Sequence, residues 1–189
     1  MNNESSEIMR MLNSEFNAYA RHHQIDLYPA SYRAHIDSLN EEIFKKFNSG
    51  VYRTGFATTQ QVYNQACNDI FEMLDKLELI LSRQRYLINN EQITETDVRA
   101  WTTLIRFDPV YVTHFKCNKK MISKDYPNLF GFTREIYQMA NIRETVDFDE
   151  IKKHYFVSHT HINPTRIIPL GPIIDYNEPH GRDIKNYKQ

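Results

Sequence analysis

Apolar residues recur every three or four positions along most of the chain, which is the spacing of one face of an α-helix. This spacing predicts helices over residues 4–19, 31–48, from 58 or 59 to about 85, 94–108 and 127–139, with a further one beginning at residue 147. We therefore expect an all-α bundle of about six helices.

The segment 94–108 carries the clearest helix signals. Thr94 can cap the helix, and Asp97 can reach back to it from the third position. Asp108 precedes Pro109, a context that disfavours helical backbone angles, so we expect the helix to end there. The segment is apolar enough to be buried, and charges inside a core need partners. Its inner charged residues are Asp97, Arg99, Arg106 and Asp108.

Turn residues divide the rest of the chain. Residues 21–30 are polar and contain Pro29, which predicts a loop, and Ser49-Gly50 is expected to break the helix before it. After Ile162, four prolines predict an extended tail. We expect this tail, residues 162–189, to pack on the helical domain through Ile167, Ile168, Leu170, Ile173 and Ile174.

Composition narrows the classes of protein. With 189 residues the chain can form one substantial core, and only five glycines disfavour a sandwich or barrel of short strands. A net charge of −1 without a basic block predicts no nucleic-acid partner. The sequence shows no apolar run of membrane-spanning length and no signal-peptide pattern, and its two distant cysteines suit a reducing compartment. We therefore expect a cytoplasmic location and no membrane partner.

Three positions are candidates for chemistry. Glu4 and Ser5 begin a predicted helix, where free N–H groups and a hydroxyl can bind a carboxylate while Glu4 holds an ammonium group. Tyr52 lies between Gly50 and Gly55, where a tyrosine can face a cleft and donate a proton. Tyr111 follows the end of the 94–108 helix. Ordinary capping and ordinary aromatic packing remain open as explanations for all of them.

Metal and thiol chemistry have weaker support. His114-x-x-Cys117 lacks the second pair that a zinc site needs, and His154, His159 and His161 fit a solvated cluster better than a metal site. We expect no metal. Cys67 lies beside an apolar stripe, as a buried inert thiol would, and neither cysteine has an evident source of a lowered pKa.

Four long segments resemble one family, the glutathionyl-hydroquinone reductases or Xi-class glutathione transferases. These segments are GVYRTGFATTQ (50–60), WTTLIRFDPVYVTHFKC (101–117), DEIKKHYFVSH (149–159) and EPHGRD (178–183). The resemblance extends over essentially the whole chain and implies the helical C-terminal domain of a transferase, with glutathione as co-substrate.

In that family, a cysteine of a thioredoxin-like domain attacks the sulfur of a glutathionyl-hydroquinone, and a second glutathione resolves the mixed disulfide. The resemblance implies that Tyr52 is the proton donor, and that Tyr111 and Tyr155 lower the pKa of the thiolate. It also implies that Glu4 and Ser5 bind the γ-glutamyl end of glutathione.

The thioredoxin-like domain and its cysteine have no counterpart in this sequence beyond a last helix, in residues 1–20. Residues 21–161 correspond to the helical domain. The resemblance thus implies a truncated transferase that is inactive alone, that forms a homodimer, and that uses a thioredoxin-like domain in cis or from another chain. The alternative is an inert helical scaffold or dimerisation module.

Overall fold

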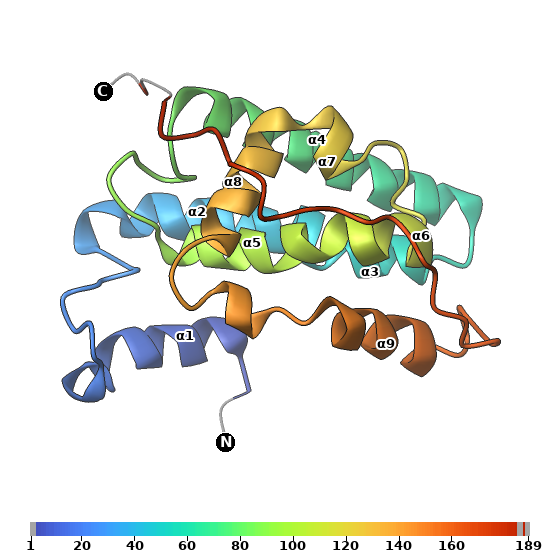
Figure 1. Ribbon diagram of the computed structural model, residues 1–189, viewed down its shortest axis with the longest axis horizontal. Helices are drawn as coiled ribbons and strands as arrows, with labels where there is room; N and C mark the ends of the chain where they lie inside the picture. The colour runs from blue at the N-terminus through green and yellow to red at the C-terminus, as the bar shows by residue number, and fades with distance from the viewer. Residues whose placement is uncertain (1–2, 185–186, 188–189) are drawn as a thin grey trace.

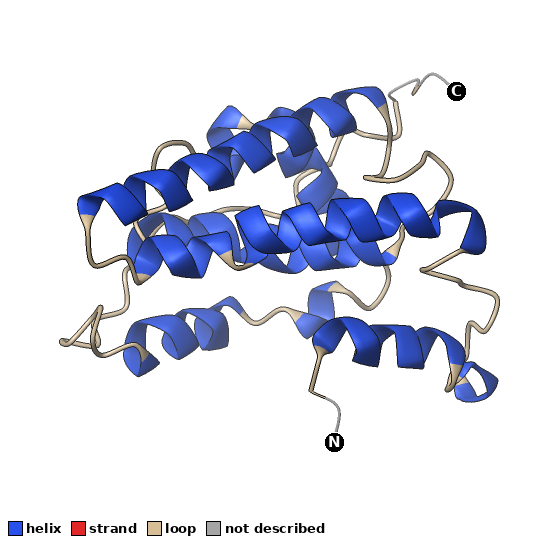
Figure 2. Cartoon of the chain, turned by 180° about the vertical axis from the view of Figure 1, so that it is seen from behind, coloured by secondary structure: helices blue, strands red, loops and turns tan. Residues whose placement is uncertain are grey.

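The computed structural model describes residues 3–184 and Tyr187, and every regular element within them is helical (Figure 2). The α-helices are α1 (Ser5–Ser14), α2 (Arg33–Ile43), α3 (Gly50–Gly55), α4 (Gln60–Arg83), α5 (Glu95–Arg106), α6 (Val112–His114), α7 (Ile122–Asp125), α8 (Pro127–Tyr137) and α9 (Phe148–Ser158). The expected all-α fold is confirmed.

The helices lie in three tiers (Figure 1). Helices α4, α7 and α8 form one outer tier, while α2, α3 and α5 form the middle tier. Helices α1 and α9, far apart in the sequence, follow one another along the opposite side. The core lies between the first two tiers, where α4 buries the stripe Ile70, Leu74, Leu77 and Leu81.

Local signals set the starts of several helices as predicted. Thr94 and Asp97 form a capping box, in which the Thr94 N–H donates to the Asp97 carboxylate at 2.8 Å. The other oxygen of Asp97 accepts from the backbone N–H of Leu87 at 2.8 Å, so one side chain caps α5 and fixes the preceding loop. Burial raises the pKa of Asp97 to about 6, and these hydrogen bonds oppose the rise. Thr59 caps α4 and Asp147 caps α9.

The predicted end of the 94–108 helix is wrong. The chain continues through Pro109 as a π-helical turn, Phe107–Tyr111, and reaches His114 in α6. In this turn the Val112 N–H donates to the Phe107 oxygen, five residues back. The Asp108 carboxylate leaves the helix surface and accepts from the backbone N–H groups of Ile122 and Ser123, both at 2.8 Å. The buried charge of Asp108 is thereby used to cap α7.

The helix before Tyr52 is also not broken at Gly50. A π-helical turn, Phe44–Asn48, leads from α2 into α3. Gly50 instead allows close packing, because a Cβ there would lie 3.1 Å from Ile70 Cγ1. At the N-terminus, α1 is shorter than predicted, and Glu4 rather than Ser5 or Ser6 is its capping residue.

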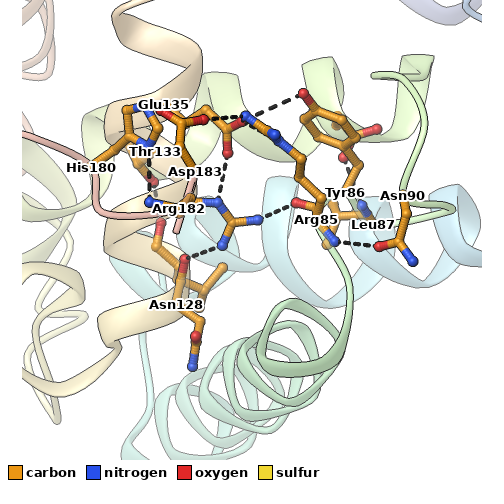
Figure 3. A network of polar contacts seen from close by, with 12 residues as sticks. Arg85, Tyr86, Leu87, Asn90, Asn128, Thr133, Glu135, His180, Arg182 and Asp183 are labelled. Carbon is orange, nitrogen blue, oxygen red and sulfur yellow. Dashed lines mark hydrogen bonds and ion pairs between the residues drawn. The ribbon is translucent and has the colours of Figure 1, made fainter. Parts of the chain in front are cut away.

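The tail crosses the bundle in an extended path (Figure 1), and two of the five expected aliphatic residues, Ile168 and Ile174, pack against the core. Leu170 and Ile173 are each 94% exposed, whereas Tyr176 and Arg182 are buried. Arg182 donates from Nε to Glu135 of α8 at 2.6 Å and from an Nη atom to the backbone oxygen of Arg85 (Figure 3). Three distant segments are therefore joined by one guanidinium.

Candidate functional site

Three tyrosine hydroxyls meet at the boundary between the middle tier and α9. The hydroxyl of Tyr155, on α9, lies 2.8 Å from that of Tyr52, on α3, and 2.8 Å from that of Tyr111, in the π-helical turn. Tyr111 and Tyr155 are buried, and Tyr52 is 37% exposed. The result is a short chain of hydroxyl groups that runs from the interior to the surface at Tyr52.

Phe115 is the packing centre of this tyrosine chain. Its ring stacks on Tyr111 at a centroid distance of 5.5 Å, and it contacts Tyr52 and Tyr155 at 5.2 and 5.9 Å. Gly55 makes room for it, since a Cβ at this position would lie 2.1 Å from the Phe115 ring. The second glycine beside Tyr52 is therefore required by the ring beneath the tyrosines.

A pocket of about 390 Å³ opens beside the tyrosine chain, within the size range of small-molecule sites. Its lining residues come from α1, α3, α5 and α9 and the two π-helical turns: Ser5, Phe44, Asn48, Tyr52, Arg99, Thr102, Thr103, Arg106, Tyr111 and Tyr155. Four of the five residues predicted for a site thus share one pocket. The fifth, Glu4, is exposed next to Ser5 and does not line it.

A second, larger hollow of about 760 Å³ adjoins the first, with Tyr52 contributing to both. Its other lining residues are mainly apolar or uncharged and include Phe56, Ala57 and Val62. Tyr52 therefore lies where a polar pocket meets an apolar one.

The surroundings of the two buried tyrosines favour the neutral phenol. Burial raises the pKa of Tyr155 to about 12, and burial also raises the pKa of Tyr111. The nearby Arg106 charge acts in the opposite direction on both, but more weakly. The two buried tyrosines remain protonated across the physiological range and act as hydrogen-bond donors.

Arg99 and Arg106 also line the pocket. From the sequence we predicted only that their charges need partners, and did not predict them as site residues. They are seven residues apart on α5, hence on the same face. That spacing could have revealed them, but nothing in the sequence showed that a pocket lies on that face.

Four histidines, His114, His154, His159 and His161, lie together next to the tyrosines, and the rings of His114 and His159 are stacked. Nε2 of His114 lies 3.0 Å from Nδ1 of His159, and His159 contacts the rings of His154 and His161. Within residues 3–184, no group of three or more His, Cys, Asp or Glu side chains is arranged to hold a metal ion. Burial first, and then the charges of His159, His161 and Lys116, lower the pKa of His114 to about 4.

This histidine pair predicts a loss of stability on acidification. In the unfolded chain His114 binds a proton near its ordinary pKa of about 6.5, whereas in the folded chain its pKa is about 4. Between these two values the unfolded state binds more protons than the folded state, so the stability of the fold decreases as the pH falls from 7. We expect the free energy of unfolding of wild type to drop between pH 7 and 5 by about 1–2 kcal/mol more than that of His114→Leu. Urea titrations at each pH measure this difference.

The exposed His35 of α2 supplies the matched control. The variant His35→Leu should keep the pH dependence of wild type. Equal pH dependence in wild type and His114→Leu would contradict the role given to the histidine pair.

Both cysteines are buried thiols, as predicted for Cys67. Burial raises the pKa of Cys117, and its side chain is fully enclosed. The hydroxyl chain thus has no reactive thiolate beside it in the part of the chain that the structure describes.

Comparisons with known proteins fit this architecture. Residues 60–135 match the family model described as glutathione S-transferase, C-terminal domain. Over 97% of its length the chain superposes on the glutathione-bound structure of YqjG, a glutathione transferase homologue from Escherichia coli K-12, with a TM-score of 0.91 and 55% identity. The fold is that of a glutathione transferase C-terminal domain.

Sequence comparison finds the same relative and a further one. The chain is 55% identical over 185 residues to the glutathionyl-hydroquinone reductase YqjG of Escherichia coli, which covers 98% of the chain and 56% of that protein. It is 43% identical over 172 residues to the glutathionyl-hydroquinone reductase PcpF of Sphingobium chlorophenolicum, which covers 91% of the chain and 54% of that protein. The chain therefore spans little more than half the length of these relatives.

The crystal structure of the Xi glutathione transferase from Phanerochaete chrysosporium also superposes on the chain, with a TM-score of 0.88 and 51% identity, covering 91% of this chain and 55% of that one.

Among the helices that the structure describes, none is both long enough and apolar enough to cross a membrane.

Proposed function

We propose that this transferase-type domain supplies the hydroquinone pocket and part of the glutathione site for the reduction of glutathionyl-hydroquinones. The observation that carries the proposal is the hydroxyl chain of Tyr52, Tyr155 and Tyr111 at the edge of a pocket. The 55% identity to a glutathionyl-hydroquinone reductase supports the choice of substrate class.

The proposed reaction needs a thiolate and a proton donor. A cysteine thiolate attacks the glutathione sulfur of the glutathionyl-hydroquinone, so that a new S–S bond forms while the bond between sulfur and the ring carbon breaks. The electron pair of the broken bond stays on the ring carbon, which takes a proton and leaves as hydroquinone. A second glutathione thiol then attacks the mixed disulfide, which frees the cysteine and releases oxidised glutathione.

The hydroxyl chain is suited to donate that proton. Three hydroxyl groups carry three hydrogens, and the two contacts among them use only two. Tyr111 is buried, and among the described residues its hydroxyl contacts Tyr155 as its acceptor, so its hydrogen points there. Tyr155 then donates to Tyr52, and the partly exposed Tyr52 keeps its own hydrogen for a ligand. With a thiolate nearby, the free hydrogen of Tyr52 would lower the thiolate pKa by bonding to its charged form, and Tyr155 and Tyr111 would support it by donating along the hydroxyl chain.

The nucleophile has to come from a thioredoxin-like domain, in cis or from another chain, because Cys67 and Cys117 are enclosed. Glu4 and Ser5 are proposed to bind the γ-glutamyl end of glutathione from α1, which would then be the last helix of that domain. A homodimer formed through the helical domain is part of the same proposal.

The test is a reconstitution assay. The purified chain is incubated with glutathionyl-menadiol and glutathione, and the release of menadiol is followed with and without a separately purified thioredoxin-like domain of a relative. We expect no turnover from the chain alone, since neither thiol is accessible, and turnover after addition of the second domain.

The other outcomes have definite meanings. Turnover by the chain alone would overturn the assignment of the nucleophile to another domain. Absence of turnover under every condition, from a chain that remains folded and dimeric, would replace the proposal with an inert scaffold.

A further inference from the structure

The pocket beside the tyrosines has a strongly cationic wall. Arg99 and Arg106 lie two turns apart on the same face of α5, and both line the pocket. No aspartate or glutamate lines it. The two positive charges therefore face the space that a ligand would occupy.

The fold does not neutralise these charges. The arginines in ion pairs within residues 3–184 are Arg10, Arg53, Arg85, Arg134 and Arg182. Glu95, one helical turn before Arg99, already accepts from Arg10 at 2.6 Å and from Asn40 at 2.8 Å, and Asp97 and Asp108 accept from backbone N–H groups. Arg99 and Arg106 thus differ from the other partly buried arginines of the chain in having no carboxylate partner.

The position of each guanidinium is nevertheless constrained. Arg106 donates from Nη1 to the backbone oxygen of Thr102 at 2.6 Å, which orients the group and leaves its other N–H donors unused. Arg99 is half-buried, and this burial lowers its pKa. A half-buried guanidinium without a counter-charge gains from an incoming anion more than a solvated one does, because it has already lost part of its hydration.

We propose that Arg99 and Arg106 bind a carboxylate of the ligand in this pocket, carried by the aromatic ring or by the glycyl end of glutathione, since the γ-glutamyl end is assigned to Glu4 and Ser5. A guanidinium matches a carboxylate with two parallel hydrogen bonds, which favours this anion over a halide. An aromatic acid held in this way would lie beside the Tyr52 hydroxyl, which lines the same pocket. The ligand class rests on the proposed function, but carboxylate binding by the isolated chain can be tested without turnover.

The experiment compares matched ligands by NMR titration of the full chain. The first pair is hydroquinone and 2,5-dihydroxybenzoate, which differ by one carboxylate on the ring. The second pair is glutathione and its glycyl ethyl ester. We expect, in at least one pair, that the ligand with the additional carboxylate binds about tenfold more tightly at low salt than its partner without it, with the advantage reduced by added salt.

Variants assign the effect to the two arginines. The double variant Arg99→Gln, Arg106→Gln should lose the preference for the ligand with the additional carboxylate. It should keep the affinity for hydroquinone and for the glutathione ester, which would show that the pocket remains folded. Arg53→Gln is the matched control, because Arg53 lines the neighbouring hollow and pairs with Asp69 at 3.2 Å; it should keep the preference.

The two ligand pairs distinguish the source of the carboxylate. A preference confined to the dihydroxybenzoate assigns the arginines to acidic quinols, and one confined to glutathione assigns them to the glutathione site. Equal affinities within both pairs, or a preference that survives the double variant, would overturn the proposal. Neither result depends on whether a thioredoxin-like domain restores turnover.

Discussion

Replacing Arg182 with alanine should reduce the free energy of unfolding by about 3–5 kcal/mol. The Arg182 side chain is 1% exposed, and Glu135, which accepts from it at 2.6 Å, is 4% exposed. The variant leaves the buried Glu135 with Arg85 as its remaining ionic partner and removes the donor to the Arg85 backbone oxygen (Figure 3). It also opens a cavity the size of a long side chain. Urea unfolding followed by circular dichroism measures the loss.

A surface ion pair provides the comparison for this variant. Lys76→Ala breaks the contact of Lys76 with Glu42, but both groups are partly exposed, so a loss of at most about 1 kcal/mol is expected. Arg182→Lys keeps the charge without the planar fork of donors and should fall between the two. A loss below 1 kcal/mol for Arg182→Ala would show that the tail contributes little to the fold.

In the enzyme reconstituted with a thioredoxin-like domain, Tyr52→Phe should lower kcat by about 10²–10⁴-fold, which is the contribution of a positioned general acid. Of the three tyrosine hydroxyls, the variant removes the one that is free to donate to a ligand. The ring at position 52 can keep its contact with Phe115 at 5.2 Å. Helical content should therefore remain unchanged. Steady-state release of menadiol, with circular dichroism of the same sample, provides both measurements.

Tyr63→Phe is the matched control for Tyr52→Phe. The hydroxyl of Tyr63 donates to the backbone oxygen of Lys116 at 2.9 Å, outside the pocket of the tyrosine chain. Its loss should leave kcat within a factor of about two of wild type. If Tyr52→Phe also stays within that range, the proton comes from another group and Tyr52 has no part in the mechanism.

The features that sequence predicted well are local ones. The capping box of Thr94 and Asp97, the Thr59 and Asp147 caps and the placement of Pro127 at the start of α8 each depend on residues within one helical turn. The all-α class followed from the apolar spacing, which is also local. Tyr52 and Tyr111 were candidates from their positions in the sequence, whereas Tyr155 came from the family resemblance alone. Their hydroxyls lie on separate elements, so no spacing indicates that they meet.

The features that sequence missed depend on distant partners. The chain passes Pro109 as a helix because the π-helical turn requires no N–H from proline and because Asp108 finds N–H donors 14 and 15 residues away. Arg182 and Glu135 are separated by 47 residues, so nothing near either one predicts their pairing. In the tail, Ile168 and Ile174 pack against the core as expected, but the burial of Tyr176 and Arg182 was not predicted.

Helix α1 contributes Ser5 to the pocket although none of its own side chains is buried. Its polar ties to the domain include Arg10, which donates to Glu95 and Asp37, and Asn13, which accepts from the Leu27 N–H at 2.8 Å. Because α1 buries none of its own side chains, we expect its detachment to cost less than global unfolding. Any ligand that contacts Ser5 favours the docked state, and part of its binding free energy is spent on that docking. Affinity at this pocket is therefore coupled to the order of α1, and a change at Arg10, remote from the tyrosines, alters the affinity without altering the pocket walls on α3, α5 and α9.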